Sequence, residues 1–201
     1  MAPARAGEGG RARERDGASD PARSRLRAYK LEAMTGAKLP DLIADDLAVV
    51  FCGTAAGNVS ARLKQYYAHR QNLFWPTLHE IGLTPRRLQP AEYSALLPLG
   101  IGLTDIAKYE SGMDRQLPRD SLGRGACRDL QRKIERRRPR ILAFTSLAAG
   151  RAFLGSAAGL GAQGRTIGAT RIWVLPSPSP AARWNWDKGH WQALTDAAAR
   201  S

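Results

Sequence analysis

The sequence is short of cysteine and of long apolar runs. Its two cysteines, Cys52 and Cys127, are too few for a zinc finger, a four-cysteine iron–sulfur site or a disulfide scaffold, and they fit a reducing compartment. No apolar run approaches the roughly 18 residues that a membrane span needs, which excludes an integral membrane protein. The first 19 residues are basic at their start but have no apolar core, so we expect no secretory signal.

Acidic residues are also scarce. Aspartate and glutamate number 18 against 31 lysines and arginines in 201 residues, which leaves a formal net charge of +13. Such a charge indicates a polyanionic partner, nucleic acid first and an acidic membrane surface second. Hydrophobic residues make up 43% of the chain, so it is not wholly disordered, and its length fits one domain of ordinary size.

The N-terminal part differs from the rest in composition. Residues 1–38 are rich in alanine, arginine, glycine and glutamate and have almost no large apolar side chain before Leu31. Such a segment buries too little surface to offset its ordering entropy, so we expect a disordered basic arm over residues 1–38. A single folded domain is expected over residues 39–201, with a second basic cluster at residues 132–140 inside it.

From Leu39 onward, short apolar runs alternate with amphipathic stretches. Strands are predicted over residues 47–52, 100–104, 140–144 and 171–175. Helices are predicted from about residue 72 to 82 and over residues 91–97, 123–138, 147–154 and 190–200. This alternation predicts an α/β fold: a three-layer sandwich with a mainly parallel central sheet of about four strands and helices on both faces.

In such a sheet, ligands bind outside the carboxyl ends of the strands, which here selects residues 53–60, 104–108, 145–146 and 176–183. The first of these segments begins with a glycine-bounded turn, GTAAGN at residues 53–58, whose backbone amides can face a ligand. The turn lacks the Gly-Lys-Ser/Thr ending of a phosphate loop and the spacing of a dinucleotide fingerprint. A tight structural turn is the alternative for this pattern.

Two further segments have unusual sequences. In YYAHRQNLFW, residues 66–75, two adjacent tyrosines and then the basic pair His69-Arg70 precede a helix capped by Asn72. Phe74 and Trp75 fit the core, whereas Tyr67 can offer a ring face on which a base stacks. In PSPSPAAR, residues 176–183, a strand ends in a proline-stiffened loop with hydroxyl groups, for which a rigid connector is the alternative.

Together these residues resemble the uracil-DNA glycosylase superfamily, and most closely its mismatch-specific uracil/thymine branch. The resemblance runs from about Leu47 to the C-terminus. It rests on FCGxxxG at residues 51–57, AHxxNxFW at 68–75, GLT at 102–104, TIG at 166–168, RIWVLP at 171–176 and the Pro-Ser loop. It implies a monofunctional DNA repair glycosylase, which flips uracil or a related deaminated base out of DNA and hydrolyses its N-glycosidic bond to leave an abasic site. The resemblance implies no metal and no cofactor.

The resemblance also assigns residues to roles. Tyr67 is the ring that stacks on the flipped base. The expected base-binding residues are Gly53, Thr54, Ala55, Ala56, Tyr67, Asn72 and Ser177. The loop that meets the minor groove and the phosphates supplies Ser179, Ala181, Arg183 and Trp184.

The catalytic position departs from the family pattern. Ala55 stands where the family usually has the Asp or Asn that positions the water. Ser177 replaces the usual His or Asn, and Ala181 replaces the intercalating residue, commonly Leu, so that Arg183 or Trp184 is left for that task. Asp105 and Asn58 are the candidates for the missing catalytic group, with Ser60 third. The alternatives are a helix-capping or exposed aspartate at Asp105 and a turn residue at Asn58.

We expect a monomer that acts on DNA, without a membrane or metal partner, in a bacterial-type cytoplasm and associated with the nucleoid. The first alternative is a non-catalytic protein of the same fold that binds DNA lesions or abasic sites, which Ala55 and Ser177 favour. The second is a nucleotide-binding α/β enzyme of another class, for which the phosphate-loop features are missing.

Overall fold

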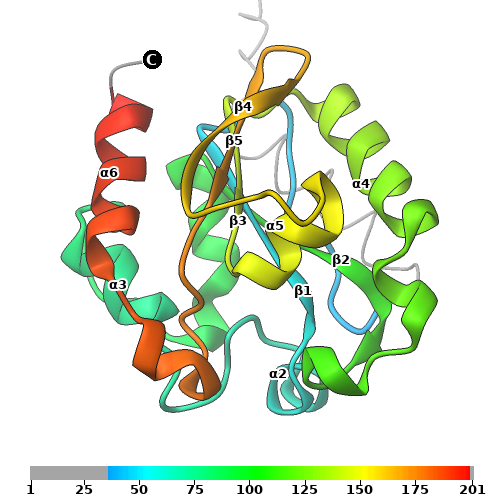
Figure 1. Cartoon of the computed structure of the whole chain (residues 1–201). Helices are drawn as coiled ribbons and strands as arrows, with labels where there is room; N and C mark the ends of the chain where they lie inside the picture. The colour runs from blue at the N-terminus through cyan, green and yellow to red at the C-terminus, as the bar shows by residue number, and fades with distance from the viewer. Residues whose placement is uncertain (1–35, 200–201) are drawn as a thin grey trace, which may run out of the picture.

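The structure is a computed structural model, and it describes residues 36–199 (Figure 1). The arm predicted over residues 1–38 lies outside the described residues apart from its last three positions. None of the helices within residues 36–199 has the length and the apolar content needed to cross a bilayer.

Within residues 36–199, five strands form one sheet. They are β1 (Val49–Ala56), β2 (Ile101–Ser111), β3 (Ile141–Phe144), β4 (Gly161–Ile167) and β5 (Thr170–Val174), in the spatial order β2-β1-β3-β5-β4. Strands β2, β1, β3 and β5 run parallel, and β4 pairs antiparallel with β5. The predicted α/β fold is therefore confirmed, with one strand more than the four expected.

Two parts of the sheet differ from the prediction for clear reasons. Strand β4 has the sequence GAQGRTI, which contains no apolar run that would predict a strand, and it is largely exposed. Strand β2 continues from Thr104 to Ser111 as an edge strand with polar residues in its second half. Its outer edge is partly covered by a short antiparallel bridge between Leu42 and Leu103.

The helices agree with the prediction over most of the chain. They are α2 (Asn58–Leu63), α3 (Phe74–Glu80), α4 (Arg124–Arg137), α5 (Leu147–Leu154) and α6 (Lys188–Ala199). The 3-10 helices are η1 (Pro90–Leu99), η2 (Asp114–Gln116), η3 (Arg119–Leu122) and η4 (Pro180–Asn185). The short helix α2 was not predicted, and η1, with prolines at both ends, replaces the helix expected over residues 91–97.

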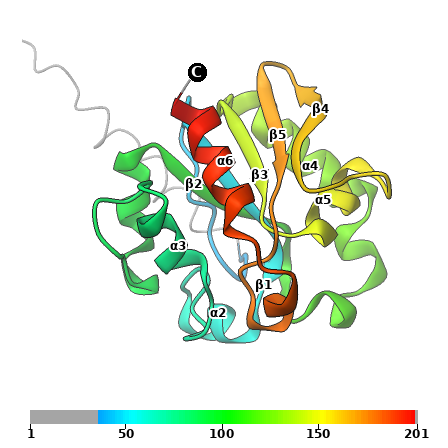
Figure 2. The same ribbon diagram turned by 60° about the vertical axis from the view of Figure 1, so that its left-hand side comes forward.

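The helices cover both faces of the sheet, as Figure 2 shows. On one face, Trp191 of α6 stacks on Phe51 of β1 with ring centroids 5.5 Å apart, and Phe74 of α3 meets the same Phe51 edge-on at 5.4 Å. On the other face lie α4 and α5. There, a Cβ on Gly150 would come within 2.6 Å of Val174 Cγ2, so only glycine lets α5 approach β5 this closely. The predicted three-layer arrangement is thus confirmed.

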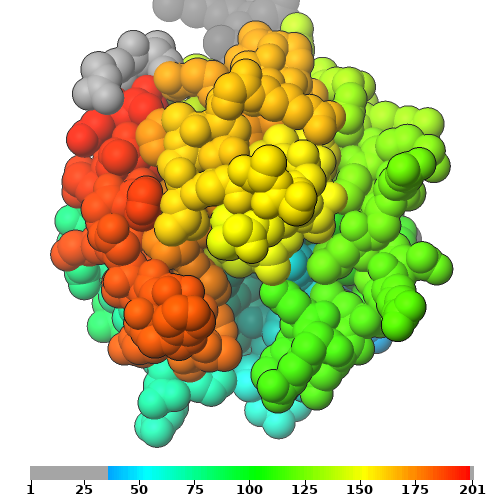
Figure 3. All heavy atoms as spheres, in the orientation of Figure 1, coloured from blue at the N-terminus to red at the C-terminus, as the bar shows by residue number. Residues whose placement is uncertain are grey.

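The chain segments that follow the strands gather at one end of the sheet. In the space-filling view the surface is hollowed between the orange residues after β5 and the green residues after β2 (Figure 3). The first of the parallel strands, β1, ends at the same side, with α2 directly after it (Figure 1). This end of the sheet is where a ligand is expected in a parallel α/β fold.

Candidate active site

The pairing of β1 with β2 and β3 brings three residues together. Gly53 of β1 pairs in register with Asp105 of β2. Thr145 directly follows β3, and its N–H donates to the Cys52 carbonyl at 2.9 Å. A Cβ on Gly53 would lie 2.5 Å from Asp105 Oδ1 and 3.8 Å from Thr145 Oγ1. The Asp105 carboxylate therefore occupies space beside Gly53 that any other residue at position 53 would fill.

Tyr67 adjoins this group of residues. Its Oη lies 3.1 Å from Thr145 Oγ1, and its ring stacks on Phe74 with centroids 3.9 Å apart and an interplanar angle of 15°. Its backbone has φ of +51°, in the left-handed region that a bulky residue rarely adopts and that is often found at functional sites. The contacts with Phe74 and Thr145 fix one face of the ring and its hydroxyl while the side chain stays half-buried.

The ionisation of Asp105 is strongly affected by its surroundings. The residue is 5% exposed, and burial raises the pKa of its carboxyl to about 6. Lys108 and Lys133 oppose that rise, whereas Asp41 adds to it. A carboxyl with a pKa near the working pH, placed within β2 beside a glycine of β1, is suited to general acid–base chemistry.

Comparison with known families is consistent with this geometry. Residues 40–197 match the Uracil DNA glycosylase superfamily. The chain belongs to this superfamily. A solution NMR structure of a Methanosarcina acetivorans protein, provisionally named a uracil DNA glycosylase, has the same fold. It is 21% identical, with a TM-score of 0.58, and the match covers 80% of this chain and 96% of that one.

The residues of the glycine-bounded motif, residues 53–57, make different kinds of contact. Gly53 lies beside Asp105, as above. Thr54 Oγ1 donates to Asp114 Oδ1 at 2.5 Å, so its hydroxyl is bound to the segment after β2. Ala55 is half-buried, and the pairing of β1 with β2 shifts between Ala55 and Ala56. Within this motif, Gly53 is the residue whose Cβ position lies against the Asp105 carboxylate.

Asn58 lies apart from the group around Asp105. It is the first residue of α2 and is exposed, and its Oδ1 is 3.8 Å from the point that a Cβ on Gly112 would occupy. Ser60 is buried, and its Oγ accepts a hydrogen bond from Ala68 N at 3.0 Å. Asp105 is thus the one of these three candidates that the structure sets against Gly53.

The Pro-Ser loop after β5 is fastened to the segment that precedes α3. Leu73 N–H donates to Pro178 O at 2.9 Å, and Arg183 Nη2 donates to Gln71 O at 2.9 Å. These two hydrogen bonds join residues more than a hundred positions apart in the sequence. The predicted DNA loop and the segment that contains Tyr67 are thus parts of one rigid surface.

Other predicted residues make local contacts within these segments. Asn72 Oδ1 accepts from Phe74 N at 2.9 Å, but the N-cap of α3 is Leu73 and not Asn72 as predicted, since the helix begins at Phe74. Ser177 Oγ accepts from Ser179 N at 3.2 Å, and Ser179 Oγ accepts from Ala181 N at 3.4 Å. Trp184 is 83% exposed, the largest exposed fraction among the large hydrophobic side chains within residues 36–199.

Sequence reasoning missed two contributors to this site. Thr145 lies in a strand-end segment that the fold rule selected, but nothing in its local sequence distinguishes it from a helix-preceding threonine. The cluster of Asp41, Lys108 and Lys133 acts on Asp105 from three separate parts of the chain. Among residues 36–199, no group of three or more His, Cys, Asp or Glu is arranged to hold a metal ion.

Proposed function

We propose that this protein is a monofunctional DNA glycosylase that excises uracil, or a related deaminated base, from DNA and leaves an abasic site. We place it nearest the mismatch-specific uracil/thymine branch, with Asp105 in place of the catalytic group missing at Ala55. One observation carries the proposal: a buried carboxylate, Asp105, lies against Gly53 and close to the ordered Tyr67 ring in a member of the uracil DNA glycosylase superfamily.

Each of these groups has a task in the proposed reaction. The flipped base stacks on Tyr67, an interaction typically worth about 1–3 kcal/mol per base. Ionised Asp105 orients the attacking water and offsets the positive charge that develops on the sugar. Backbone N–H groups of residues 53–56 stabilise the negative charge on the leaving pyrimidine, as an oxyanion hole does. Proton transfer by a positioned carboxylate commonly contributes about 10²–10⁴-fold to a rate.

The loop after β5 makes the contacts with the DNA backbone in this proposal. Arg183 meets a phosphate, and Trp184 enters the space that the flipped nucleotide leaves in the duplex. Ala181 is too small for that second task, whereas Trp184 is 83% exposed and next to Arg183. A wedge of this kind offsets the few kcal/mol that unstacking costs.

Release of uracil from oligonucleotides, read as strand cleavage after alkali, tests the proposal. The substrates are single strands and duplexes with U·G, U·A or hypoxanthine. The test variant is Asp105→Asn, and its matched control is Asp196→Asn, which changes an exposed carboxylate on α6. Cleavage that requires Asp105 but not Asp196 supports the proposal, and no cleavage on any substrate overturns it.

A non-catalytic lesion-binding protein is the second candidate. It is favoured by Ala55, which can neither accept a proton nor orient water, and by Ser177, whose hydroxyl already accepts from Ser179 N. Gel shifts on uracil-containing and abasic duplexes, run beside the cleavage assay, separate the two candidates. Binding that persists without turnover selects the lesion-binding protein.

The excision rate is expected to fall in acid as Asp105 becomes protonated. Since the pKa of this carboxyl is about 6, excision should be near its maximum above pH 7 and decrease about tenfold for each pH unit below about 5. Single-turnover rates between pH 4.5 and 8.5 measure this limb. A rate that is constant across pH 5–7 would contradict the assigned role of Asp105.

Trp184→Ala is expected to slow excision from duplex DNA about tenfold, a loss equivalent to roughly 1.4 kcal/mol, because the gap in the stack is left unfilled. Excision from a single strand should change little, since no duplex has to be opened there. The exposed Leu160 gives a control variant, Leu160→Ala, for loss of apolar surface elsewhere. Equal effects of Trp184→Ala on single-stranded and duplex substrates would argue against a wedge.

A further inference from the structure

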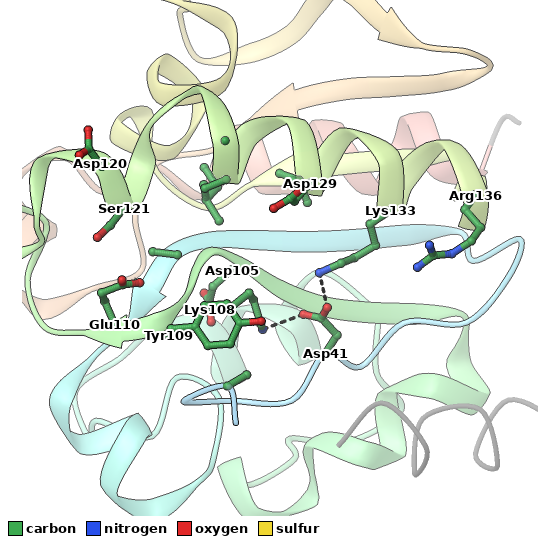
Figure 4. Close-up of a pocket in the computed structure, with 16 residues that line it drawn as sticks. Asp41, Asp105, Lys108, Tyr109, Glu110, Asp120, Ser121, Asp129, Lys133 and Arg136 are labelled. Atoms are coloured by element: carbon green, nitrogen blue, oxygen red, sulfur yellow. Dashed lines mark hydrogen bonds and ion pairs between the residues drawn. The ribbon is translucent and has the colours of Figure 1, made fainter. Parts of the chain in front are cut away.

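A cluster of three charged side chains lies between β2 and α4. Lys108 Nζ of β2 lies 2.7 Å from Asp41 Oδ1, and Lys133 Nζ of α4 is bonded to Asp41 Oδ2. Thr104 Oγ1 also donates to Asp41 Oδ1, at 2.6 Å. The three charged side chains are only 11–19% exposed. Figure 4 shows both lysines pointing toward the Asp41 carboxylate.

The same cleft contains Asp105. A space of about 600 Å³ between β2 and α4 is lined by Asp41, Asp105, Lys108 and Lys133, among other residues. Lys108 is three residues after Asp105 on the same strand. Thr104, which donates a hydrogen bond to Asp41, directly precedes Asp105. One short stretch of β2 thus supplies Asp105, Lys108 of the cluster and the threonine that bonds to Asp41.

Among the four largely buried charged side chains, Asp41, Asp105, Lys108 and Lys133, the charges balance in only one ionisation state. One lysine would neutralise Asp41, but the structure supplies two, which leaves the cluster with a single positive charge in excess. When Asp105 is ionised, the two carboxylates and the two ammonium groups sum to zero. Because buried charge without a partner is costly, this arrangement favours the ionised form of Asp105.

We propose that Asp41, Lys108 and Lys133 form a positioning cluster, which holds one excess positive charge beside Asp105 and thereby keeps that carboxyl ionised for base excision. This inference rests on the proposed function. Asp41 fixes two flexible lysine side chains in place, so that their charge acts on Asp105 at a constant distance. Lys108 has the stronger effect on Asp105 and Lys133 the weaker one, while the negative charge of Asp41 acts in the opposite direction.

Other ionisable groups do not supply this charge, because Cys52, Tyr66 and Tyr67 are neutral. At the cleft, Glu110, Asp120 and Asp129 are acidic, and Arg136 is exposed. Burial raises the pKa of Cys52, Tyr66 and Tyr67 well above their ordinary values, and the carboxylate of Asp105 adds to each rise. Burial alone would raise the pKa of Asp41 too, but Lys108 and Lys133 outweigh it and hold that pKa below its usual value. The two lysines are therefore the source of positive charge at Asp105.

The pH profile of single-turnover excision tests the proposal through charge changes of opposite sign. Lys108→Met and Lys133→Met each remove a positive charge. Each should move the acid limb of the profile, where the excision rate falls, to a higher pH by about one unit. Asp41→Asn removes a negative charge and should move the limb downward. Lys133→Arg keeps the charge and should leave the limb in place, as should Lys188→Met, a control at an exposed ion pair with Glu80.

A ¹³C-NMR titration of the Asp105 carboxyl, assigned by difference from Asp105→Asn, gives a readout that needs no activity. Its midpoint should follow the same directions in the same variants. If the wild-type protein excises nothing, the proposed function fails, and the titration still decides the role of the cluster. A midpoint that is unchanged in folded Lys108→Met and Lys133→Met overturns the inference.

The loss of one partner from a buried ion cluster can prevent folding, so a charge-compensated variant completes the test. Asp41→Asn/Lys133→Met removes one charge of each sign and leaves Lys108 as the single positive charge. Its Asp105 midpoint should lie above that of Asp41→Asn and close to that of the wild type. A midpoint equal to that of Asp41→Asn would show that Lys133 does not act on Asp105, and would overturn the inference.

Discussion

Asp105→Asn is expected to reduce uracil excision by about 10²–10⁴-fold, the usual contribution of a positioned acid–base group. Asparagine has the size of aspartate and fits beside Gly53, but it cannot carry the negative charge that orients water and offsets charge on the sugar. Single-turnover excision from a U·G duplex at pH 7.5 measures the loss. Asp196→Asn, at an exposed carboxylate of α6, should retain the wild-type rate.

The same variant is expected to be more stable than the wild type. Because the pKa of Asp105 is raised to about 6 in the folded state from 3.8, the associated stability is fully present below about pH 4 and is lost as the pH rises through 6. At neutral pH the buried carboxylate thus costs about 3 kcal/mol, which Asp105→Asn should recover in part. Thermal unfolding should show a gain at pH 8 that is about half as large at pH 5. A lower melting temperature at both values would contradict this account.

Gly53→Ala is expected to lower excision about 10²-fold or more while the fold is retained, because the new methyl group displaces the catalytic carboxylate. The added Cβ would lie 2.5 Å from Asp105 Oδ1, far closer than van der Waals contact allows, and that oxygen must move. Strand β1 itself can accept alanine, since Gly53 is not among the glycines with positive φ.

The control for Gly53→Ala is Gly57→Ala, at the residue between β1 and α2. A Cβ on Gly57 meets no atom within 4 Å, so its substitution should leave excision near the wild-type rate. Circular dichroism and thermal unfolding confirm that both variants fold. Equal activity of Gly53→Ala and the wild type would show that the position of the Asp105 carboxylate beside Gly53 is not needed for catalysis.

Local sequence was sufficient for the elements that have a strong apolar pattern. The helix over residues 147–154 was predicted with the bounds of α5, and the buried strands β1, β3 and β5 were found within a few residues. Strand β4 was not predicted because its residues are polar and exposed. Its place in the sheet depends on pairing with β5, which is a tertiary contact that no single segment encodes.

The strand-end rule selected residues 104–108, but β2 continues to Ser111, so Asp105 lies within that strand. With the family's catalytic group missing at Ala55, Asp105 and Asn58 were both candidates, and the catalytic role of Asp105 stays a prediction. The depth of its burial and its approach to Gly53 depend on the pairing of β1 with β2. Asp41 and Lys133 are 92 positions apart in the chain, and no spacing rule reaches across that interval. Their link to Asp105 therefore needed the structure.

The hydrogen bonds from Leu73 to Pro178 and from Arg183 to Gln71 have a consequence for how damaged bases are found. They join the loop after β5 to the Tyr67 segment in the free protein. The entropy cost of ordering this surface is therefore incurred during folding and not each time the protein meets DNA. A protein that scans a long duplex meets undamaged sites almost everywhere. A receptor that is already assembled can test each extruded base without a closing step, and it leaves undamaged positions as quickly as it reached them.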